Sequence, residues 1–433
     1  MSLLVNNKKI NIASVILAGG KGKRLYPLTK NHSKPAISYG GRYRLIDIPI
    51  SNSLNSNIRQ MFVIGQYLTA ELQHHLSQTY QFDAFHPGML DFLSPEEFPN
   101  GQKIWFDGTA DAVRKNLDTI LKAPVDYFLI LSGDQLYNID FKKMLEFHIE
   151  KDANLTIASL PVESHEAQRL GILKANEKSF IIDFIEKPQE EETLKHFSLP
   201  SSFLKEHDLK KRKPQYLASM GIYIFKRQAL QDILKEDARE DFGKYLIPTE
   251  IKKGKTVSFV YDGYWEDIGT IESYYKANLA LTDPTYPGLK TYDENNPIYT
   301  RVNHLPGVTI TNTKVKNSIL CEGSVINAKE ITQSVIGLRS FIKKGTIIQN
   351  SIVLGNNYYI SPSHQEKFFP SRFEIGKNCL IKKTIIDEHT CIGNNVQLIN
   401  KENLSHYDGE GIIVRDGIIV VTAGAHIPDN FVF

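Results

Sequence analysis

The sequence predicts an α/β protein, in which a doubly wound, mostly parallel, Rossmann-like sheet is followed by a parallel β-helix. Three observations lead to this fold class. The 433 residues exceed what one hydrophobic core usually serves, so two domains are expected. From residue 14 to about residue 281, short β-branched runs alternate with longer segments of helical character. After Pro297, apolar residues recur at every sixth position.

The first part alternates predicted strands with predicted crossovers. Helix-like stretches at residues 109–121 and 141–151 are long enough to connect parallel strands. This alternation is typical of a sheet with helices on both faces. The predicted strands are SVILA, MFVIG, YFLILSGD, LTIASL, MGIYIF and VSFVYD.

The second part has the period of a parallel β-helix, in which three hexads close one triangular coil and the repeated aliphatic residues fill its axis. A set of unrelated short strands is the alternative. Residues 356–372 break the period and are expected to loop out, and residues 283–297 are the predicted linker, which gives domains at 1–285 and 298–433. The hexad residues are Ile319, Val325, Ile331, Val335, Phe341, Ile347, Val353, Leu380, Ile386, Ile392 and Leu398.

Charge and cysteine content narrow the function. The 51 basic and 49 acidic residues leave a net charge of +2, which indicates neither a nucleic-acid surface nor a polybasic membrane anchor. Cys321, Cys379 and Cys391 lack disulfide-framework or zinc-ligand spacing and are expected to be buried filler. No run of about 20 apolar residues and no signal-like segment occurs. We therefore expect a cytoplasmic protein of small-molecule chemistry, with no nucleic-acid or membrane partner.

A glycine-rich turn follows the first predicted strand. In LAGGKGKRLYPLT, residues 17–29, glycines let backbone N–H groups approach phosphate oxygens, and Lys23 and Arg24 add positive charge. The loop is neither a Walker loop nor a dinucleotide fingerprint. It suits a nucleoside triphosphate, although a bland turn would also explain Gly19, Gly20 and Gly22 if they stood alone.

Charged residues also follow two later strands. Asp134 ends the run YFLILSGD and should lie at the carboxyl edge of the sheet, where ligands of α/β proteins bind. An acidic residue there can hold a metal ion, and a helix N-cap or turn is the structural alternative. Glu186 and Lys187 emerge after the run IIDFI, where opposite charges often only solvate an edge.

These motifs resemble the sugar nucleotidyltransferase family, whose pattern LAGGxGxRLxPLT is followed by KPA, here Lys34 to Ala36. Within that family, the chain is similar to the glucose-1-phosphate adenylyltransferase branch over nearly its whole length. The resemblance implies that the second domain is a left-handed parallel β-helix with regulatory and oligomerisation roles, in a homotetramer. The further matching motifs are YRLIDIPISNSLNS, GTADAVR, LSGDQLY, FIEKP, ASMGIYIF, DFGK, YWEDIGTIESYYKAN and SVIGLRS.

The resemblance also implies a reaction and its residues. An adenylyl group passes from ATP to glucose 1-phosphate, in line and without a covalent enzyme intermediate, and gives ADP-glucose and pyrophosphate for glycogen or starch synthesis. The resemblance assigns catalysis to Arg24, Lys34 and Asp134. It assigns Mg²⁺ binding to Asp134 and Asp267, although Asp267 also fits an ordinary turn. The resemblance assigns nucleotide binding to Leu17, Ala18, Gly19, Gly20, Gly108 and Thr109. It assigns binding of the sugar-phosphate substrate to Gln66, Gly171, Glu186, Lys187 and Ser219.

Three positions depart from the family pattern. A glutamine that reads the base is replaced by the stretch MLDFLSPEE, with Phe92 and Leu93. Phe106 stands where Tyr is frequent, and Gln135 where many members have His. Two alternatives therefore stay open: a UDP- or dTDP-glucose-forming enzyme, and a regulatory subunit of a mixed oligomer. Retention of Arg24, Lys34, Asp134 and Lys187 speaks against the second.

The resemblance places anionic effectors in a basic cleft between the domains. The chain keeps Lys30, Arg44 and Arg415 as candidate regulatory residues. Each charge-assisted contact contributes roughly 1.5–3 kcal/mol, so lost cations predict weak or absent activation by phosphorylated glycolytic intermediates. Any response should strengthen at lower pH, as His32 gains charge near a pKa of about 6.5. Positions where the family has other cations hold Asn31, His32, Glu388 and Ala423.

Overall fold

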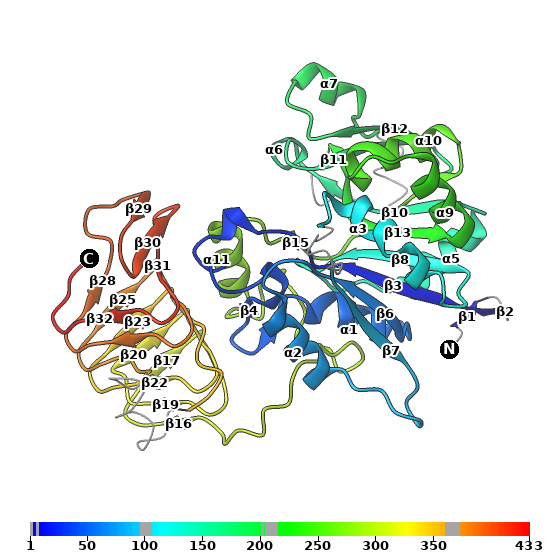
Figure 1. Ribbon diagram of the computed structural model, residues 1–433. Helices are drawn as coiled ribbons and strands as arrows, with labels where there is room; N and C mark the ends of the chain where they lie inside the picture. The colour runs from blue at the N-terminus through cyan, green and yellow to red at the C-terminus, as the bar shows by residue number, and fades with distance from the viewer. Residues whose placement is uncertain (1–2, 6–7, 96–104, 201–202, 204–214, 360–372) are drawn as a thin grey trace, which may run out of the picture.

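The computed structural model describes residues 3–5, 8–95, 105–200, 203, 215–359 and 373–433. The chain up to helix α11 (Ile271–Ala280) is organised around one large sheet, and the chain from strand β16 (Thr309–Ile310) forms a stack of short strands beside it (Figure 1). None of the helices in these ranges combines the length and apolar character that a bilayer span requires.

A nine-stranded sheet is the centre of the first domain. Its strands are β3 (Ile12–Leu17), β6 (Gln60–Ile64), β7 (Met89–Leu93), β8 (Tyr127–Ser132), β10 (Leu155–Val162), β11 (Gly171–Ala175), β12 (Ile181–Glu186), β13 (Tyr216–Lys226) and β14 (Thr256–Val260). The main order is β12-β11-β13-β8-β3-β6-β7, and β10 joins β13 to β14. β8, β3, β6 and β7 run parallel, whereas β13 is antiparallel to β8.

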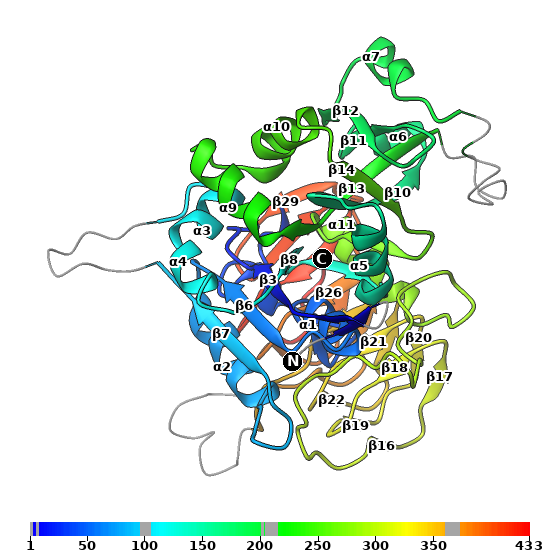
Figure 2. The same cartoon turned by 90° about the vertical axis from the view of Figure 1, so that its right-hand side faces the viewer.

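The sheet is covered on both faces, as the alternating sequence predicts. Along β3, Ile12 and Ile16 belong to one apolar core and Ala13 and Val15 to another, because successive side chains of a strand point to opposite faces. Figure 2 shows helices on either side of these strands. The helices of eight or more residues are α1 (Asp47–Asn55), α2 (Thr69–Thr79), α5 (Phe141–Glu150), α9 (Arg227–Glu236) and α11.

The helix predicted at residues 109–121 is divided into α3 (Thr109–Lys115) and α4 (Leu117–Ile120). Asn116 lies at the break, and its side-chain amide donates to the carbonyl of Ala112 at 2.8 Å. Such local bonds compete with the backbone ladder of a helix, which accounts for the break. The predicted helix at 141–151 is α5, where the Asp140 carboxylate caps the backbone amides of Lys142 and Lys143.

The second domain is a parallel β-helix built from three ladders of strands. Apart from antiparallel pairing at one edge, described below, the strands pair in parallel with the strand one coil later, as in Val315↔Ile331 and Ile331↔Ile348. The first ladder holds β16, β19 (Val325–Ile326) and β22 (Phe341–Ile342); the second holds β17 (Lys314–Lys316), β20 (Glu330–Thr332), β23 (Ile347–Gln349), β25 (Leu380–Lys382) and β28 (Gln397–Leu398). The third holds β18 (Ile319–Leu320), β21 (Val335–Ile336), β24 (Ile352–Val353), β26 (Thr384–Ile386), β31 (Ile418–Val421), β30 (Ile412–Arg415) and β29 (His406–Asp408).

One corner of each coil is tighter than three full hexads would make it. At this corner a residue with positive φ, Asn317, Gln333, Asn350 or Lys383, precedes a serine or threonine. The hydroxyls form a ladder from coil to coil: the amide of Ser334 donates to Ser318 Oγ at 3.2 Å, and the amide of Ser351 donates to Ser334 Oγ at 3.1 Å. The left-handed residue shortens the turn, and the ladder aligns the coils.

The hexad prediction identifies the β-helix but assigns part of its core wrongly. Ile331, Val353, Ile386, Ile392 and Leu398 are buried as predicted. Val325 is 44% exposed, and Phe341, Ile347 and Leu380 are half-buried. Because both residues of these short strands are aliphatic or aromatic, the sequence does not reveal which one faces inwards. The inward-facing neighbours are Ile326, Ile342, Ile348 and Ile381.

Two interruptions lengthen the β-helix coils. Ile352 pairs with Ile385 across the first, and residues 360–372 of the predicted loop lie outside the described residues. The second was not predicted. It contains the antiparallel hairpin of β29 and β30, which joins the edge of the third ladder.

The two domains share an apolar seam along α11. Tyr274 and Tyr275 of this helix lie in one buried cluster with Val335, Ile352 and Ile385 of the β-helix. The Tyr275 hydroxyl also donates to the carbonyl of Asn350 at 2.6 Å. At about 25 cal/mol for each Å² of apolar surface removed from water, such a seam favours one fixed arrangement of the domains.

Gly41 brings the two backbones into direct contact. Its φ is +79°, and a Cβ there would lie 2.7 Å from Cys321 Sγ and 3.2 Å from Gly337 Cα. The Leu338 amide donates to the Gly41 carbonyl at 3.2 Å. A residue with a side chain would therefore have a strained backbone at this position, and its Cβ would also push the two domains apart.

We predict that Gly41→Ala lowers the free energy of unfolding by about 2–5 kcal/mol, from left-handed strain of about 1–2 kcal/mol and overpacking of about 1–3 kcal/mol. Gly254→Ala is the matched control, because Gly254 has a φ of +80° but no atom within 4 Å of the added Cβ. Urea unfolding of both variants measures the difference. Equal losses would show that the close approach at Gly41 has no energetic weight.

Candidate active site

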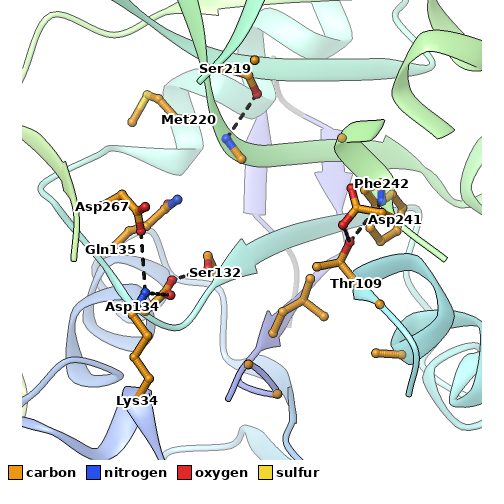
Figure 3. Close-up of a pocket in the computed structure, with 18 of the residues that line it drawn as sticks. Lys34, Thr109, Ser132, Asp134, Gln135, Ser219, Met220, Asp241, Phe242 and Asp267 are labelled. Atoms are coloured by element: carbon orange, nitrogen blue, oxygen red, sulfur yellow. Dashed lines mark hydrogen bonds and ion pairs between the residues drawn. The ribbon is translucent and has the colours of Figure 1, made fainter. Parts of the chain in front are cut away.

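A pocket of about 590 Å³ opens at the carboxyl edge of the sheet, where β3 and β8 end. Gly19 and Gly20 of the glycine-rich loop belong to its lining. Figure 3 shows another part of the lining, with Lys34, Asp134 and Asp267 near one another and Thr109 beside Asp241. Of the residues that the resemblance assigns to catalysis, nucleotide, sugar phosphate and metal, all line this pocket except Ala18. Ala18 is buried, and its amide donates to the carbonyl of Ile64 at 2.7 Å.

The glycine-rich loop connects β3 to the 3-10 turn η1 (Lys23–Leu25). Gly22 has a φ of +59°, and a Cβ there would meet Thr29 Cγ2 at 2.8 Å and Lys34 Cβ at 3.2 Å. Gly20 has no neighbour within 4 Å of such a position, so its backbone is open to a ligand. The loop thus keeps free backbone beside the pocket, the arrangement that suits phosphate oxygens.

A lysine lies between two carboxylates at the centre of the pocket. Lys34, in the 3-10 turn η2 (Lys34–Ala36), forms an ion pair with Asp134, and its Nζ lies 3.8 Å from Asp267 Oδ1. Asp134 follows β8 after Gly133 and accepts a hydrogen bond from Ser132. Asp267 ends β15 (Trp265–Asp267), which pairs with β9 (Gln135–Tyr137) and so places the two carboxylates side by side.

These carboxylates fit a magnesium site. Burial and the charge of Asp134 raise the pKa of Asp267, more than Lys34 and Arg24 lower it, so the pair still lacks positive charge. Mg²⁺ uses one or two carboxylates together with substrate phosphates and water. The described residues hold no cluster of three or more His, Cys, Asp or Glu side chains suited to a metal ion, so phosphate oxygens would complete the coordination.

The predicted sugar side of the pocket is formed by β11, β12 and β13. Glu186 and Lys187 form an ion pair at 3.1 Å, and Lys187 adopts a φ of +48° with its amide bound to the carbonyl of Leu170. Gly171 gives Glu186 room, because a Cβ there would lie 2.7 Å from Glu186 Oε2. Ser219 Oγ accepts from the Gly221 amide at 3.3 Å. Together they present a carboxylate, a cation and a hydroxyl to one ligand.

Gln66 joins the glycine-rich loop to the segment that precedes α3. Its amide nitrogen donates to the carbonyls of Gly19 at 3.3 Å and Phe106 at 3.2 Å, and its oxygen accepts from the Phe106 amide at 2.9 Å. The resemblance predicts a contact with substrate. In the structure Gln66 lines the pocket, and these hydrogen bonds connect two of its walls.

The amino end of α3 forms the opposite wall. Gly108 approaches the Glu240 carbonyl so closely that a Cβ would lie 2.4 Å from its oxygen. Thr109 Oγ1 donates to Asp241 Oδ2 at 3.2 Å and accepts from the Phe242 amide at 3.0 Å. Phe92 and Leu93, where the resemblance predicts base recognition, lie outside the lining.

Sequence reasoning missed several lining residues. The ring of Tyr67 stacks on Trp105 with centroids 5.3 Å apart, and Lys21 Nζ lies 4.8 Å from the Tyr67 centroid. Asp241 lies in the DFGK motif, which was recognised without a role. Lys21 was within the glycine-rich motif, whereas nothing in the sequence joins Tyr67 to Trp105. Arg169 and Tyr223 also line the pocket.

The three predicted regulatory residues do not gather at one site. A second cleft, of about 360 Å³, lies between the domains and includes Arg44 but neither Lys30 nor Arg415. Arg415 forms an ion pair with Asp408 at 2.6 Å and lies 6.0 Å from the ring centroid of Tyr26. Of the three predicted regulatory residues, the structure thus places Arg44 in the lining of this cleft.

A pocket at the carboxyl edge of an α/β sheet, with a glycine-rich loop and several cations, defines a class of proteins that act on phosphorylated ligands. A family model described as nucleotidyl transferase matches residues 13–284, which is more than half of the chain, and one described as GLGC left-handed parallel beta-helix domain matches residues 303–432. The chain belongs to the nucleotidyl transferase family, with the two domains of a GlgC-like sugar nucleotidyltransferase.

We predict that Asp134→Asn lowers turnover by about 10²-fold or more without unfolding the chain, because the change keeps the shape but removes a charge at the centre of the pocket. Asp126→Asn is the matched control, since Asp126 precedes the other end of β8 and accepts from the Asn11 amide. Turnover and thermal unfolding are measured for both. Residual Asp134→Asn activity above about a tenth of wild type would contradict the assignment.

Proposed function

We propose that the protein transfers an adenylyl group from ATP to glucose 1-phosphate and so acts as a glucose-1-phosphate adenylyltransferase. The observation that carries this proposal is the pocket itself, which brings the glycine-rich loop, Lys34 with Asp134, and the pair of Glu186 and Lys187 around one space. The family supplies the reaction class. The choice of adenine rests on the motifs GTADAVR and SVIGLRS, with the β-helix as support.

The reaction requires positioning and charge rather than a covalent intermediate. A phosphate oxygen of the sugar attacks the α-phosphorus of ATP in line, and pyrophosphate leaves. Lys187 and Glu186 would hold the sugar phosphate and hydroxyls, Lys34 would orient oxygens at the transferred group, and Arg24 would stabilise the leaving group. Asp134 and Asp267 would hold Mg²⁺, which supplies positive charge to the phosphates when bound.

Pyrophosphate release tests this function directly. The purified protein, with Mg²⁺ and glucose 1-phosphate, is given each of the four nucleoside triphosphates. Release with ATP supports the proposal, whereas preference for UTP or dTTP would make this a UDP- or dTDP-glucose-forming enzyme. No release with any nucleotide would favour a regulatory subunit, although the complete set of charged residues in the pocket speaks against that role.

We predict that ATP is preferred with loose discrimination against the other nucleotides. Sharp rejection of a wrong base requires polar groups that are left unpaired by it. Several apolar side chains contribute to the lining, and the amide of Gln66 is already bonded within the protein. The kcat/KM values for four nucleotides measure the preference, and a strict selection of ATP would show that backbone groups read the base. Among these apolar residues are Leu17, Ile64, Phe106 and Ala112.

Lys187→Ala should raise the KM for glucose 1-phosphate far more than the KM for ATP, because the FIEKP motif assigns the Lys187 ammonium to the sugar phosphate in this proposal. Lys174→Ala is the control, since Lys174 lies on neighbouring β11, points to His196, and is not part of the pocket lining. Initial rates with each substrate varied in turn give both constants. Equal increases in the two KM values would place Lys187 elsewhere in the reaction.

A further inference from the structure

A buried arginine joins three parts of the chain at the domain boundary. Arg44, in β5 (Tyr43–Arg44), donates from Nη1 to the carbonyl of Ala36 at 2.5 Å, and its Nη2 forms an ion pair with Glu71 at 2.8 Å. The side chain of Arg44 is only 13% exposed. Within the first domain, this guanidinium therefore connects the active-site turn η2 with helix α2.

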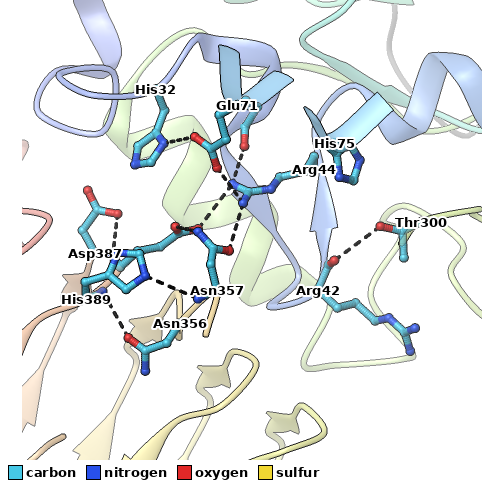
Figure 4. Close-up of polar contacts among 12 residues, drawn as sticks. His32, Arg42, Arg44, Glu71, His75, Thr300, Asn356, Asn357, Asp387 and His389 are labelled. Atoms are coloured by element: carbon cyan, nitrogen blue, oxygen red, sulfur yellow. Dashed lines mark hydrogen bonds and ion pairs between the residues drawn. The ribbon is translucent and has the colours of Figure 1, made fainter. Parts of the chain in front are cut away.

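The β-helix completes the set of partners. Glu388, at the corner after β26, lies with Oε1 3.3 Å from Arg44 Nη1, and its side chain is 5% exposed. Asn357 accepts from Arg44 Nη2 at 3.2 Å and donates to Glu388 Oε2 at 2.6 Å. Figure 4 shows Arg44 of the first domain meeting Asn357 of the β-helix, with Glu71 beside the same guanidinium. Both Glu388 oxygens and both terminal nitrogens of Arg44 are thus used.

The contact leads to the active site along a short path. Ala36 and Lys34 belong to the same 3-10 turn, and Lys34 reaches Asp134 and Asp267. The turn has further backbone support, because the Ile46 amide donates to the carbonyl of Pro35 at 3.0 Å. Arg44 is the side chain that extends this support to the β-helix.

We propose that Glu388 of the β-helix is a positioning residue for nucleotidyl transfer, which acts through Arg44 to hold the η2 turn and its Lys34 in place. The proposal rests on transfer at the Lys34 site and not on the choice of base. Glu388 stands where the resemblance places a cation, and its carboxylate lies 3.3 Å from Arg44 Nη1. The boundary between the domains is in this way part of the active-site scaffold.

The charged residues around Arg44 are consistent with an ion pair between Arg44 and Glu388. Burial raises the pKa of Glu71, but the hydrogen bond from His32 and the charge of Arg44 lower it by more. Burial lowers the pKa of His32, but the bond and charge of Glu71, with the charges of Glu388 and Asp387, raise it by more. Burial and the charge of Glu388 raise the pKa of Asp387 to about 7, so this second acid is less ionised. Glu388 and Glu71 are therefore the carboxylates that meet Arg44 directly.

A second pair across the boundary offers a comparison. Arg42 Nη2 lies 3.6 Å from Glu322 Oε1 on the same side of the β-helix, but neither residue contacts η2. Loss of the Arg42–Glu322 ion pair therefore shows what the loss of any interdomain ion pair does. A further effect of losing the Arg44–Glu388 pair then reports on the position of Lys34. Glu388→Gln and Glu322→Gln each remove one carboxylate and keep its shape.

The experiment compares these two variants of the full chain by hydrogen exchange and by kinetics. The amides of Ala36 and Ile37 are protected within η2, by the carbonyls of Ser33 and Lys34. We expect Glu388→Gln to exchange faster in the peptide that contains η2 and to lose about tenfold in kcat, with KM changed less than twofold, because misplacement by about 1 Å costs up to 10²-fold. Glu322→Gln should change neither. Unchanged exchange and kcat in Glu388→Gln, or equal effects in both variants, would overturn the proposal.

A double-mutant cycle tests the path through Arg44. If Glu388 acts through Arg44, then Glu388→Gln lowers kcat in the wild-type background but not in an Arg44→Gln background. Additive losses would overturn the proposal. If Glu388→Gln fails to fold, Asn357→Ala replaces it, since Asn357 is exposed and contacts the same guanidinium. We expect Asn357→Ala also to exchange faster in the η2 peptide and to lose kcat. No change in either quantity would again overturn the proposed positioning role of Glu388.

The readouts separate this inference from the proposed function. Activities are compared with the nucleotide that the wild type prefers, so a wrong choice of base affects only the proposed function. Hydrogen exchange at η2 requires no activity. If the wild type were inactive with every nucleotide, the proposed function would fail while exchange in Glu388→Gln would still support or refute the positioning role.

Discussion

Helix α11 is covered by apolar residues of both domains, and the other contacts between the domains depend on this burial. Only with the β-helix held against Tyr274 and Tyr275 can Gly41 meet Cys321 or Glu388 reach Arg44. The apolar contact, which has no preferred direction, thus holds the two domains at the distance at which hydrogen bonds and ion pairs between them can form. Because the same cluster includes Leu25 and Ile37, which flank the glycine-rich loop and η2, the seam also supports the loops of the pocket.

The pocket itself is organised by incomplete charge compensation. Lys34 lies between two carboxylates, and burial with the charge of Asp134 raises the pKa of Asp267 more than the charges of Lys34 and Arg24 lower it. A metal ion held by Asp134 and Asp267 would add positive charge at this point. Gln66 contributes differently, since it binds only protein atoms and keeps the two walls at a fixed spacing.

The sequence allows the fold and most of the pocket to be predicted, for identifiable reasons. Period and strand-end chemistry are local, so Asp134 could be placed at the sheet edge and the β-helix could be identified from its hexads. Features that depend on distant contacts could not be predicted. The inward phase of Val325 and Ile326, the stack of Tyr67 on Trp105, and the hairpin of β29 and β30 are decided by packing between segments. The same applies to Glu388, whose partner is 344 residues away.

The seam along α11 uses only the ladder of the β-helix that contains β21, β24, β26 and β31. Each coil of the β-helix contacts mainly the coils before and after it. A structural change in one coil therefore affects mainly these two neighbours. Within the part of the chain that the structure describes, no residue of the ladders that contain β16 and β17 belongs to this apolar cluster. A change on either of these two ladders would therefore have to pass through the shared axis of the coil before it reached α11 and the pocket beside it.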